Sequence, residues 1–494
     1  MQNPVRQLAN WGFIVSGQKI MKEGLTFDDV LLIPKKSRVF SRKDVSLKIQ
    51  FSRNIELSTP IVSANMDTVT ESRMARFLAE AGGIGIIHRF LSIEQEVEEV
   101  KKVKRAENIV IDDPYTIYPH QTIAEARKIM GGDSVSGLLV VDEKKRLLGI
   151  ITLRDILFEN DDAKNVSEVM TKKVITAPVN ISSSKAKEIL HKYRIEKLPL
   201  VSKNGVVKGL ITSKDILKKS QNSITSKDKK GRLLVGAAIG VKDDALARTK
   251  SLLDAGADAI VIDIAHGHNI RAMETVKILK KKFRGIEIIA GNVATAEGTI
   301  DLIKAGADAV KVGIGPGAAC TTRVVTGVGV PQLTAIMDSV RAASKFGVPI
   351  IADGGVKNSG DFSKALAAGA SSVMIGSLFA GTDEAPGEYI IEDGVAYKLY
   401  RGMASRDAAQ DKIKLDASTG LSTGGGADGF SRSPEGKAGR VTYRGSAKNV
   451  IGDLIGGLRS SMSYLGAKNI KEFSQNAEFI KITPASFKEG QARN

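Results

Sequence analysis

One short sequence motif recurs along the chain: a helical segment, a glycine, and then a buried strand. The clearest copies are LLDAGADAIVID at 252–263, LIKAGADAVKVG at 302–313 and ALAAGASSVMIG at 365–376, with a fainter copy, FLAEAGGIGIIH, at 77–88. Glycine commonly follows the last turn of a helix because it adopts the left-handed conformation without strain. The strands lack polar alternation, which is typical of a parallel sheet covered on both faces. The repeat therefore predicts a chain built from βα units.

Strands of this kind are expected at eight places: 60–66, 84–88, 234–239, 259–264, 287–291, 309–314, 349–352 and 372–375. Helical patterns follow most of them. Eight such units predict an α/β protein of the (β/α)₈ TIM-barrel class. Polar or glycine residues follow the strand ends, among them Asp263, Asn292 and Asp353. Because barrels of this class place their chemistry at the carboxyl ends of the strands, these residues are candidates for a shared site.

A second repeat interrupts the barrel between its second and third strands. GIITLRDI at 149–156 returns as GLITSKDI at 209–216, and each copy follows an amphipathic helix and an apolar strand. We expect barrel segments at 1–108 and 224–494 around an insertion at 109–223, with halves at 109–163 and 164–223. The insertion resembles a CBS pair. That resemblance implies an adenine or guanine nucleotide held by Asp155 and Asp215; the alternative is a spacer that shapes oligomers.

The glycine-rich stretch VKVGIGPGAACTTRVVT at 310–326 contains Cys320, the only cysteine in the chain. Glycines let a backbone approach a ligand closely, and the amides of such a loop can bind an anion. A lone cysteine is more often a buried, inert residue. Its place after a barrel strand favours a nucleophile instead. Further on, 415–434 is rich in Gly, Ser and Asp and predicts a mobile flap, taken as about 405–440.

Composition excludes several classes of protein. No apolar run approaches the ~20 residues of a membrane helix, and the first residues lack the apolar core of a signal peptide. One cysteine excludes an intrachain disulfide, so we expect a cytoplasmic protein. The formal charge is +17, but lysine is spread over helices rather than gathered on one motif, so no dedicated nucleic-acid site is expected. The positive field would favour a phosphorylated substrate.

Ordered motifs along nearly the whole chain resemble the IMP dehydrogenase/GMP reductase family. They include GLTFDDVLL (24–32), NMDTVTE (65–71), DIAHGH (263–268), GNVAT (291–295), VGIGPGAACTTR (312–323), ADGG (352–355), YRGMAS (400–405) and GGLRSSM (456–462). The resemblance implies purine nucleotides, IMP or GMP, as substrates, a nicotinamide cofactor, NAD or NADPH, and a homotetramer that can pair into an octamer. It also implies a thioimidate that Cys320 forms with C2 of the purine.

The same resemblance implies roles for the residues at the strand ends. Thr322 and Glu435 would transfer protons near C2. The other implied groups are Asp353 for ribose; Gly355, Gly376, Ser377 and Tyr400 for the 5′-phosphate; Met403, Ala404 and Glu435 for the base; Asp263, Asn292 and Gly313 for the cofactor; and the carbonyls of Gly315, Gly317 and Cys320 for potassium. One position departs from the family pattern. Ala318 stands where a phosphate-binding serine is usual.

The direction of the reaction depends on how the adduct is resolved. Dehydrogenases of the family hydrolyse it with an Arg-Tyr pair on the flap, and no Arg-Tyr follows Tyr400 here. The equivalent place, 420–422, is Gly-Leu-Ser. Asn65 and the His-Arg-Phe at 88–90 also favour a reductase, whereas AHGH, the insertion and GGLRSSM favour a dehydrogenase. The sequence therefore predicts GMP reductase, with IMP dehydrogenase as the alternative and a non-catalytic nucleotide-sensing scaffold as a third hypothesis.

Overall fold

The computed structural model describes residues 23–106, 110–111, 114–132, 135–179, 181–213, 216, 224–418 and 433–491. The chain divides into two compact units, one formed by the segments before 107 and after 223, the other by 107–223. Each unit is considered by itself. Within the described residues, no helix has both the length and the apolar character needed to cross a membrane.

The first unit is a closed barrel of parallel strands in the order β13-β14-β15-β16-β17-β18-β4-β5. Their bounds are β4 (Ile61–Ser63), β5 (Ile84–Ile87), β13 (Val235–Ile239), β14 (Ala259–Asp263), β15 (Glu287–Val293), β16 (Ala309–Val312), β17 (Ile350–Asp353) and β18 (Ser372–Ile375). All eight strands expected from the sequence are present, and the (β/α)₈ barrel is confirmed. Nearly every strand residue is buried, which explains why the strands lack polar alternation.

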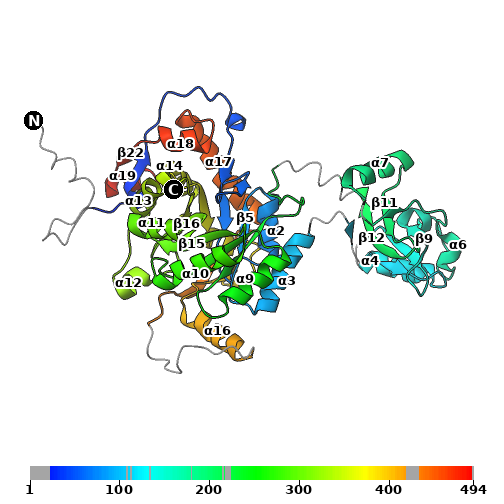
Figure 1. Cartoon of the computed structure of the whole chain (residues 1–494). Coiled ribbons are helices and arrows are strands. Elements are labelled where there is room, and N and C mark those ends of the chain that lie inside the picture. Colours follow the sequence, from blue (N-terminus) through cyan, green and yellow to red (C-terminus); the bar gives the residue numbers. More distant parts are fainter. Residues whose placement is uncertain are drawn as a thin grey trace, which may run out of the picture. The chain divides into compact units, whose positions relative to one another are not determined.

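Helices surround the barrel on its outer side (Figure 1). They are α2 (Ser72–Glu80), α3 (Ile93–Arg105), α9 (Ala245–Ala255), α10 (Ile270–Lys282), α11 (Ala296–Ala305), α13 (Gln332–Ala343), α14 (Ser359–Ala367), α17 (Ala447–Tyr464) and α18 (Ile470–Asn476). Glycines of the recurring motif end two of these helices. Gly256 and Gly306 have left-handed φ angles of 102° and 114° after the last helical residue. The recurring motif is therefore the end of a helix followed by a strand of the barrel, as the sequence predicts.

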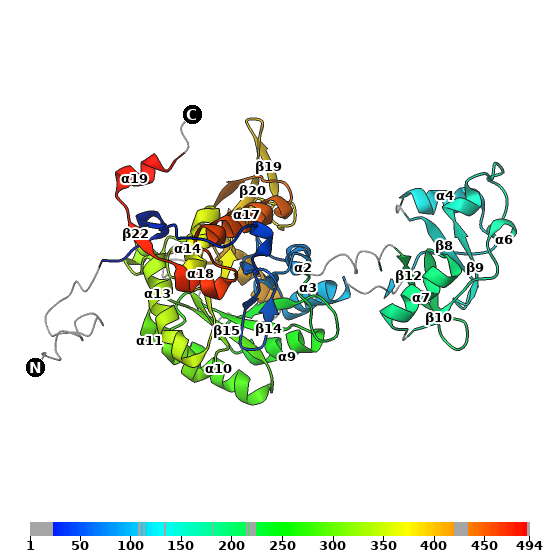
Figure 2. The ribbon, with the colours of Figure 1, turned by 90° about the horizontal axis from the view of Figure 1, so that it is seen from above.

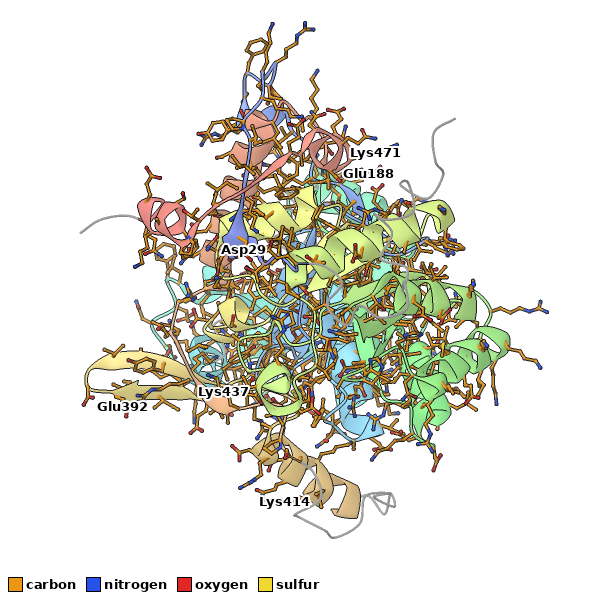
Figure 3. All side chains as sticks on the ribbon, turned by 90° about the vertical axis from the view of Figure 1, so that its left-hand side faces the viewer. Asp29, Glu188, Glu392, Lys414, Lys437 and Lys471 are labelled. Carbon is orange, nitrogen blue, oxygen red and sulfur yellow. The ribbon has the colours of Figure 1, made fainter. Side chains whose placement is uncertain are left out.

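Smaller elements extend the barrel at its edges. They are η1 (Phe27–Asp29), β1 (Val30–Leu32), η2 (Arg42–Asp44), β2 (Ile49–Gln50), β3 (Glu56–Leu57), α12 (Thr322–Thr326), η3 (Ser344–Phe346), α15 (Ser377–Ala380), β22 (Phe479–Lys481) and α19 (Pro484–Glu489). Strand β22 pairs antiparallel with β1. A three-stranded sheet is formed by β19 (Tyr389–Glu392), β20 (Val395–Arg401) and β21 (Ala438–Thr442). Its β19–β20 hairpin projects from the barrel (Figure 2), with Glu392 near the tip (Figure 3).

The segment predicted to be a flap differs from that expectation at both ends. It begins with α16 (Arg406–Ser418), on which Lys414 is marked in Figure 3, and it ends in β21. Tertiary contacts hold this helix in place, since Ala408 is buried and Asp411 pairs with Arg401 of β20 at 2.7 Å. The glycine-rich centre, 419–432, lies outside the described residues.

The second unit contains two small sheets. One joins β7 (Thr116–Ile117), β8 (Gly137–Val141) and β9 (Leu147–Thr152); the other joins β10 (Ala177–Pro178), β11 (Lys197–Val201), β12 (Val207–Thr212) and β6 (Val110–Ile111). Its helices are α4 (Ile123–Gly132), α5 (Leu153–Ile156), α6 (Val166–Val169) and α7 (Ser183–Tyr193). Strand β6 comes first in the sequence but pairs with β12, which lies in the later half.

Candidate active site

A cavity of about 550 Å³ opens at the carboxyl ends of the barrel strands. Its lining includes every barrel residue to which the resemblance assigns a role: Asp263, Asn292, Gly313, Gly315, Gly317, Cys320, Thr322, Asp353, Gly355, Gly376, Ser377, Tyr400, Met403, Ala404 and Glu435. The fold thus brings together residues that lie as far as 172 positions apart, from Asp263 to Glu435. Their individual roles stay predictions.

Cys320 lies in this cavity at the start of a short helix. Its thiol donates to the hydroxyl of Thr322, with 3.1 Å between Sγ and Oγ1. The backbone here pairs with the chain that returns from the flap: the Thr321 amide donates to the Glu435 carbonyl, and the Lys437 amide donates to the Ala319 carbonyl, both at 2.9 Å. These bonds hold Glu435 beside the cysteine loop although the two segments are far apart in sequence.

Arg323 braces the same loop. Its guanidinium donates to the Val330 carbonyl at 2.6 Å and to the Ile314 carbonyl at 3.4 Å. Gly315 has a φ of +87°, and a Cβ there would come within 2.5 Å of the Arg323 side chain. Only glycine allows the arginine to pack so closely. The contacts of Arg323 therefore fix the shape of the glycine-rich loop.

Asp353 is the centre of a buried polar network. Its Oδ2 accepts hydrogen bonds from Lys311 Nζ at 2.6 Å and from Asn292 Nδ2 at 2.9 Å. Lys311 Nζ also lies 3.8 Å from Asp263 Oδ1. Burial alone lowers the pKa of Lys311, but the carboxylates of Asp353 and Asp263 outweigh burial and raise that pKa above its usual value. The lysine therefore stays charged between two acidic side chains.

Lys311 was not predicted as a site residue from the sequence. A signal was present, because lysine interrupts an otherwise apolar inner strand, AVKV at 309–312. Its side chain is only 3% exposed. Lysine is almost never fully buried without a charged partner, so its place in that strand indicated a buried acidic partner nearby.

Tyr400 reaches the cavity from β20. Burial, followed by the nearby charge of Asp353, raises the pKa of its phenol. The hydroxyl is therefore protonated at neutral pH and can donate a hydrogen bond. It lies 3.8 Å from the Met66 sulfur, and a Cβ on Gly376 would come within 3.2 Å of it. The phenol thus faces the carboxyl end of β18, where phosphate binding is expected.

The residues present fit a nicotinamide cofactor. Asn292 donates through Nδ2 to the Gly313 carbonyl at 2.8 Å, while its Oδ1 is buried and has no hydrogen-bond partner among the described residues. Buried acceptors are normally satisfied. A carboxamide bound in the cavity would supply the missing donor. Asp263, the next residue of this subsite, lies 3.6 Å from Arg89 Nε.

Two places are candidates for metal ions. In the cysteine loop, the Gly317 carbonyl accepts the Cys320 amide at 3.0 Å and keeps a second lone pair for a cation. Outside the cavity, the ligand atoms of His268, Glu297 and Asp301 lie within 4.8 Å of one another. A hydrogen bond of 3.0 Å between His268 Nε2 and Asp301 Oδ2 accounts for part of that proximity.

Of the two residues of the insertion that are predicted to bind a nucleotide, only one lies within the described residues. Asp155 is the third residue of the short helix α5, and its Oδ2 accepts hydrogen bonds from the amide and the hydroxyl of Thr152, both at 2.7 Å. Its other oxygen lies 3.5 Å from the Thr171 hydroxyl. Asp155 thus has a local role in capping a helix. Asp215 lies outside the described residues.

This chain is similar to known proteins of a single family. The sequence model described as "IMP dehydrogenase / GMP reductase domain" matches residues 24–493. A protein of Nitrosopumilus maritimus named inosine-5′-monophosphate dehydrogenase is 53% identical over 95% of this chain and 98% of its own. One of the same name from Aquifex aeolicus is 52% identical over 97% of both chains.

Among solved structures, a GMP reductase variant of Trypanosoma brucei in complex with guanosine 5′-monophosphate superposes with a TM-score of 0.85. It is 44% identical and covers 96% of this chain and 98% of its own. A GMP reductase of the same organism in complex with guanosine 5′-triphosphate is 42% identical, covers 94% and 98% of the two chains, and has a TM-score of 0.74. Fold, cavity and comparisons agree that this chain is an NAD(P)-dependent oxidoreductase, and that it belongs to the IMP dehydrogenase/GMP reductase family.

Proposed function

We propose that this oxidoreductase acts at C2 of a purine 5′-nucleotide, with Cys320 as the nucleophile. The observation that carries this proposal is the thiol of Cys320 at 3.1 Å from the Thr322 hydroxyl, in a cavity shared with Glu435 and Asp353. The sulfur would bond to C2, Thr322 and Glu435 would move protons there, and Asp353 would accept the ribose hydroxyls. A nicotinamide cofactor held beside Asn292 would supply or accept the hydride.

The first candidate for the overall reaction is oxidation of IMP to XMP. The relatives named IMP dehydrogenase are about half identical to this chain over nearly its whole length. This similarity over nearly the whole chain supports IMP dehydrogenase better than the missing Arg-Tyr pair supports GMP reductase. The GMP reductase prediction made from the sequence is therefore the less well supported of the two. In this reaction the hydride leaves C2 for NAD⁺, and water then releases XMP from the sulfur.

GMP reductase remains the second candidate, because a specific observation favours it. Residues 401–494 contain no Arg-Tyr pair to activate water, and general-base assistance typically contributes ~10²–10⁴-fold to such a step. A reductase needs no hydrolysis, since the adduct loses ammonia and accepts a hydride from NADPH. The solved structure with bound GMP, at 44% identity, is consistent with this direction.

One pair of assays separates the two reactions. The purified chain is incubated with IMP and NAD⁺, and separately with GMP and NADPH, while products are followed by chromatography. Steady formation of XMP supports the dehydrogenase. A burst of NADH limited to one per active site, together with ammonia release from GMP, supports the reductase. A Cys320→Ala variant that turns over like the wild type would contradict the cysteine mechanism in both reactions. A wild-type chain without turnover in either assay would favour the scaffold hypothesis.

Potassium is proposed at the cysteine loop, held by the carbonyls of Gly315, Gly317 and Cys320. The glycines supply backbone oxygens without side chains in the way. Replacing potassium by sodium, at constant ionic strength, is expected to slow turnover. Equal rates in the two salts would argue against a specific site.

The insertion is proposed to bind a purine nucleotide that regulates the barrel. The T. brucei relative solved with guanosine 5′-triphosphate makes GTP the first ligand to test, followed by ATP. Titration with each nucleotide, while activity and particle size are measured, would also test the proposed tetramer and octamer. Asp155→Ala should weaken the response if its carboxylate contacts ribose.

A further inference from the structure

Gln332 links the ends of two neighbouring barrel strands. It is the first residue of α13, and its Nε2 donates to the carbonyl of Val312 at 2.9 Å and to the carbonyl of Asp353 at 3.0 Å. The residue is only 2% exposed. Val312 ends β16 and Asp353 ends β17, so one amide group joins the two strands where they enter the active site.

The orientation of this amide is fixed by its surroundings. Only the nitrogen of a carboxamide can donate to two carbonyls, so a flipped side chain would place oxygen against oxygen. As a result Oε1 faces away from both strands, and it is buried without a hydrogen-bond partner within the described ranges. A buried acceptor without a partner destabilises the folded chain. The two donated bonds therefore come with a local penalty that an apolar side chain of similar size would avoid.

The two carbonyls that Gln332 holds lie next to the reacting groups. Val312 precedes Gly313 and the loop that carries Cys320. The other strand end, Asp353, presents the carboxylate that contacts Lys311 and Asn292. Packing between these strand ends is close, because a Cβ on Gly313 would lie 2.0 Å from the Asp353 carbonyl oxygen and 3.1 Å from Gln332 Nε2. A change in strand separation would therefore move the sulfur relative to the carboxylate.

Asn292 makes the matching link from the other side. Its Nδ2 donates to the Gly313 carbonyl and to the side chain of Asp353, whereas Gln332 donates to the Asp353 main chain. The resemblance assigns Asn292 to the cofactor subsite, but it assigns nothing to Gln332. The second amide thus has no role in the expected chemistry, although it contacts the same two strand ends.

We propose that Gln332 is a positioning residue that sets the distance between the Cys320 loop and the nucleotide-binding carboxylate of Asp353. This inference rests on the proposed function of those two residues. It predicts a defect in nucleotide binding and adduct formation, since the link joins the nucleophile to the proposed ribose ligand. The cofactor subsite should be affected less, because Asn292 keeps its own hydrogen bonds to Gly313 and Asp353.

Gln332→Met and Gln332→Glu test the inference in the full-length protein. The methionine variant keeps the size of the side chain and removes the donor. We expect kcat/KM for the nucleotide to fall about tenfold to a hundredfold, the range for a misplacement below 1 Å, with the cofactor KM within about threefold. In the glutamate variant a carboxylate would face two carbonyls, and protonation would restore one donor. Its activity relative to wild type should therefore rise as the pH falls.

Ser339→Ala provides the matched control. Ser339 lies on the same helix, is fully buried, and has a hydroxyl without a partner among the described residues, but it does not line the cavity. A kcat/KM for Gln332→Met within twofold of wild type, or equal to that of Ser339→Ala, would overturn the inference. If the methionine variant fails to fold, a glutamate variant whose pH profile parallels wild type overturns it instead.

The wild type, assayed alongside, separates this inference from the proposed function. Absence of turnover with either nucleotide would count against the proposed reactions. The role of Gln332 would then be decided by equilibrium dialysis of IMP and GMP. Affinity that is equal in wild type and Gln332→Met, or absent in both, would overturn the inference.

Discussion

The thiol of Cys320 donates a hydrogen bond to the hydroxyl of Thr322 across 3.1 Å, and both residues line the same cavity. Thr322 is the first residue of α12, so its backbone is held by the following helical turn, while Cys320 lies in the loop before it. Any group that bonds to the sulfur therefore comes within reach of the threonine hydroxyl. That hydroxyl can both accept and donate a proton.

Thr322→Val should abolish most turnover while leaving nucleotide binding in place. Valine keeps the branched shape of threonine but cannot transfer a proton. We expect kcat to fall about 10²–10⁴-fold, the usual contribution of a positioned acid or base, with KM for the nucleotide within a few-fold. Steady-state kinetics with IMP and with GMP measure both quantities.

Thr275→Val is the control for that substitution. Thr275 lies on α10, and its hydroxyl donates to a carbonyl one turn back, outside the cavity. It should retain wild-type kinetics. A Thr322→Val enzyme that also retained them would show that proton transfer near the sulfur uses another group.

Lys311→Met should destabilise the protein and weaken nucleotide binding. The substitution leaves Asp353 and Asp263 facing each other without the cation between them. Removing one partner of a buried ion pair typically costs about 3–5 kcal/mol. Urea unfolding of wild type and variant measures the loss. The double variant with Asp353→Asn removes one of the two carboxylates, so it should recover part of the lost stability although not the activity.

The pH dependence of this stabilisation follows from the direction of the pKa shift. The pKa of Lys311 is higher in the folded chain than its ordinary value. A raised pKa means that the folded state binds the proton more tightly, so the contribution is complete below the unfolded pKa, ~10.4 for lysine. It is lost as the pH rises through the folded value. The difference in unfolding free energy between wild type and Lys311→Met should therefore be constant near neutral pH and shrink only in alkaline solution.

The barrel could be predicted from the sequence because its signal is local and repeated. Gly256 and Gly306 end helices, and the apolar runs after them form barrel strands. Each copy of the motif therefore predicts the same helix end and strand. The cavity lining was predictable for a related reason, since residues after parallel strands meet at one edge. The cysteine loop, with its glycines, stands out in the same way.

The contacts that hold the site together were not predictable in this way. Gln332 begins an ordinary helix, and nothing near it in sequence indicates that its amide reaches the ends of β16 and β17. The pairing of Glu435 with the cysteine loop joins segments more than 100 residues apart, and only the family resemblance indicated that the two lie together. Helix α16 was missed because its composition resembles a solvated segment, and its anchor, the Arg401–Asp411 pair, is a tertiary contact.

Gly313→Ala should inactivate the enzyme with little effect on the rest of the fold. Gly313 has a φ of +151°, and an added Cβ would lie 2.0 Å from the Asp353 carbonyl oxygen. The strand ends would have to separate, which moves the cysteine loop. Gly439→Ala, where no atom lies within 4 Å and φ is unrestricted, is the matched control. Equal kcat/KM for both variants would contradict the close packing described at this position.

The last prediction concerns Arg401, which joins α16 to the loop after β4. Its Nε and Nη2 donate to Asp67 Oδ2 at 2.9 and 2.6 Å, and its Nη1 donates to Asp411 at 2.7 Å. The Asp67 amide in turn lies 3.4 Å from the sulfur of Met403, which lines the cavity. Arg401 therefore connects the start of the flap to a residue expected to face the base.

Arg401→Lys and Asp411→Asn should differ in size of effect. A lysine cannot replace the planar fork that serves both carboxylates, so we expect kcat/KM to fall about tenfold, the loss of roughly 1.4 kcal/mol. Asp411 is half exposed, and ion pairs exposed to solvent contribute little, so Asp411→Asn should stay within about threefold. Because the pKa of Asp411 is lowered, chiefly by its hydrogen bond with Arg401, the pair persists at neutral pH. Equal losses in the two variants would mean that α16, rather than the Asp67 contact, positions Met403.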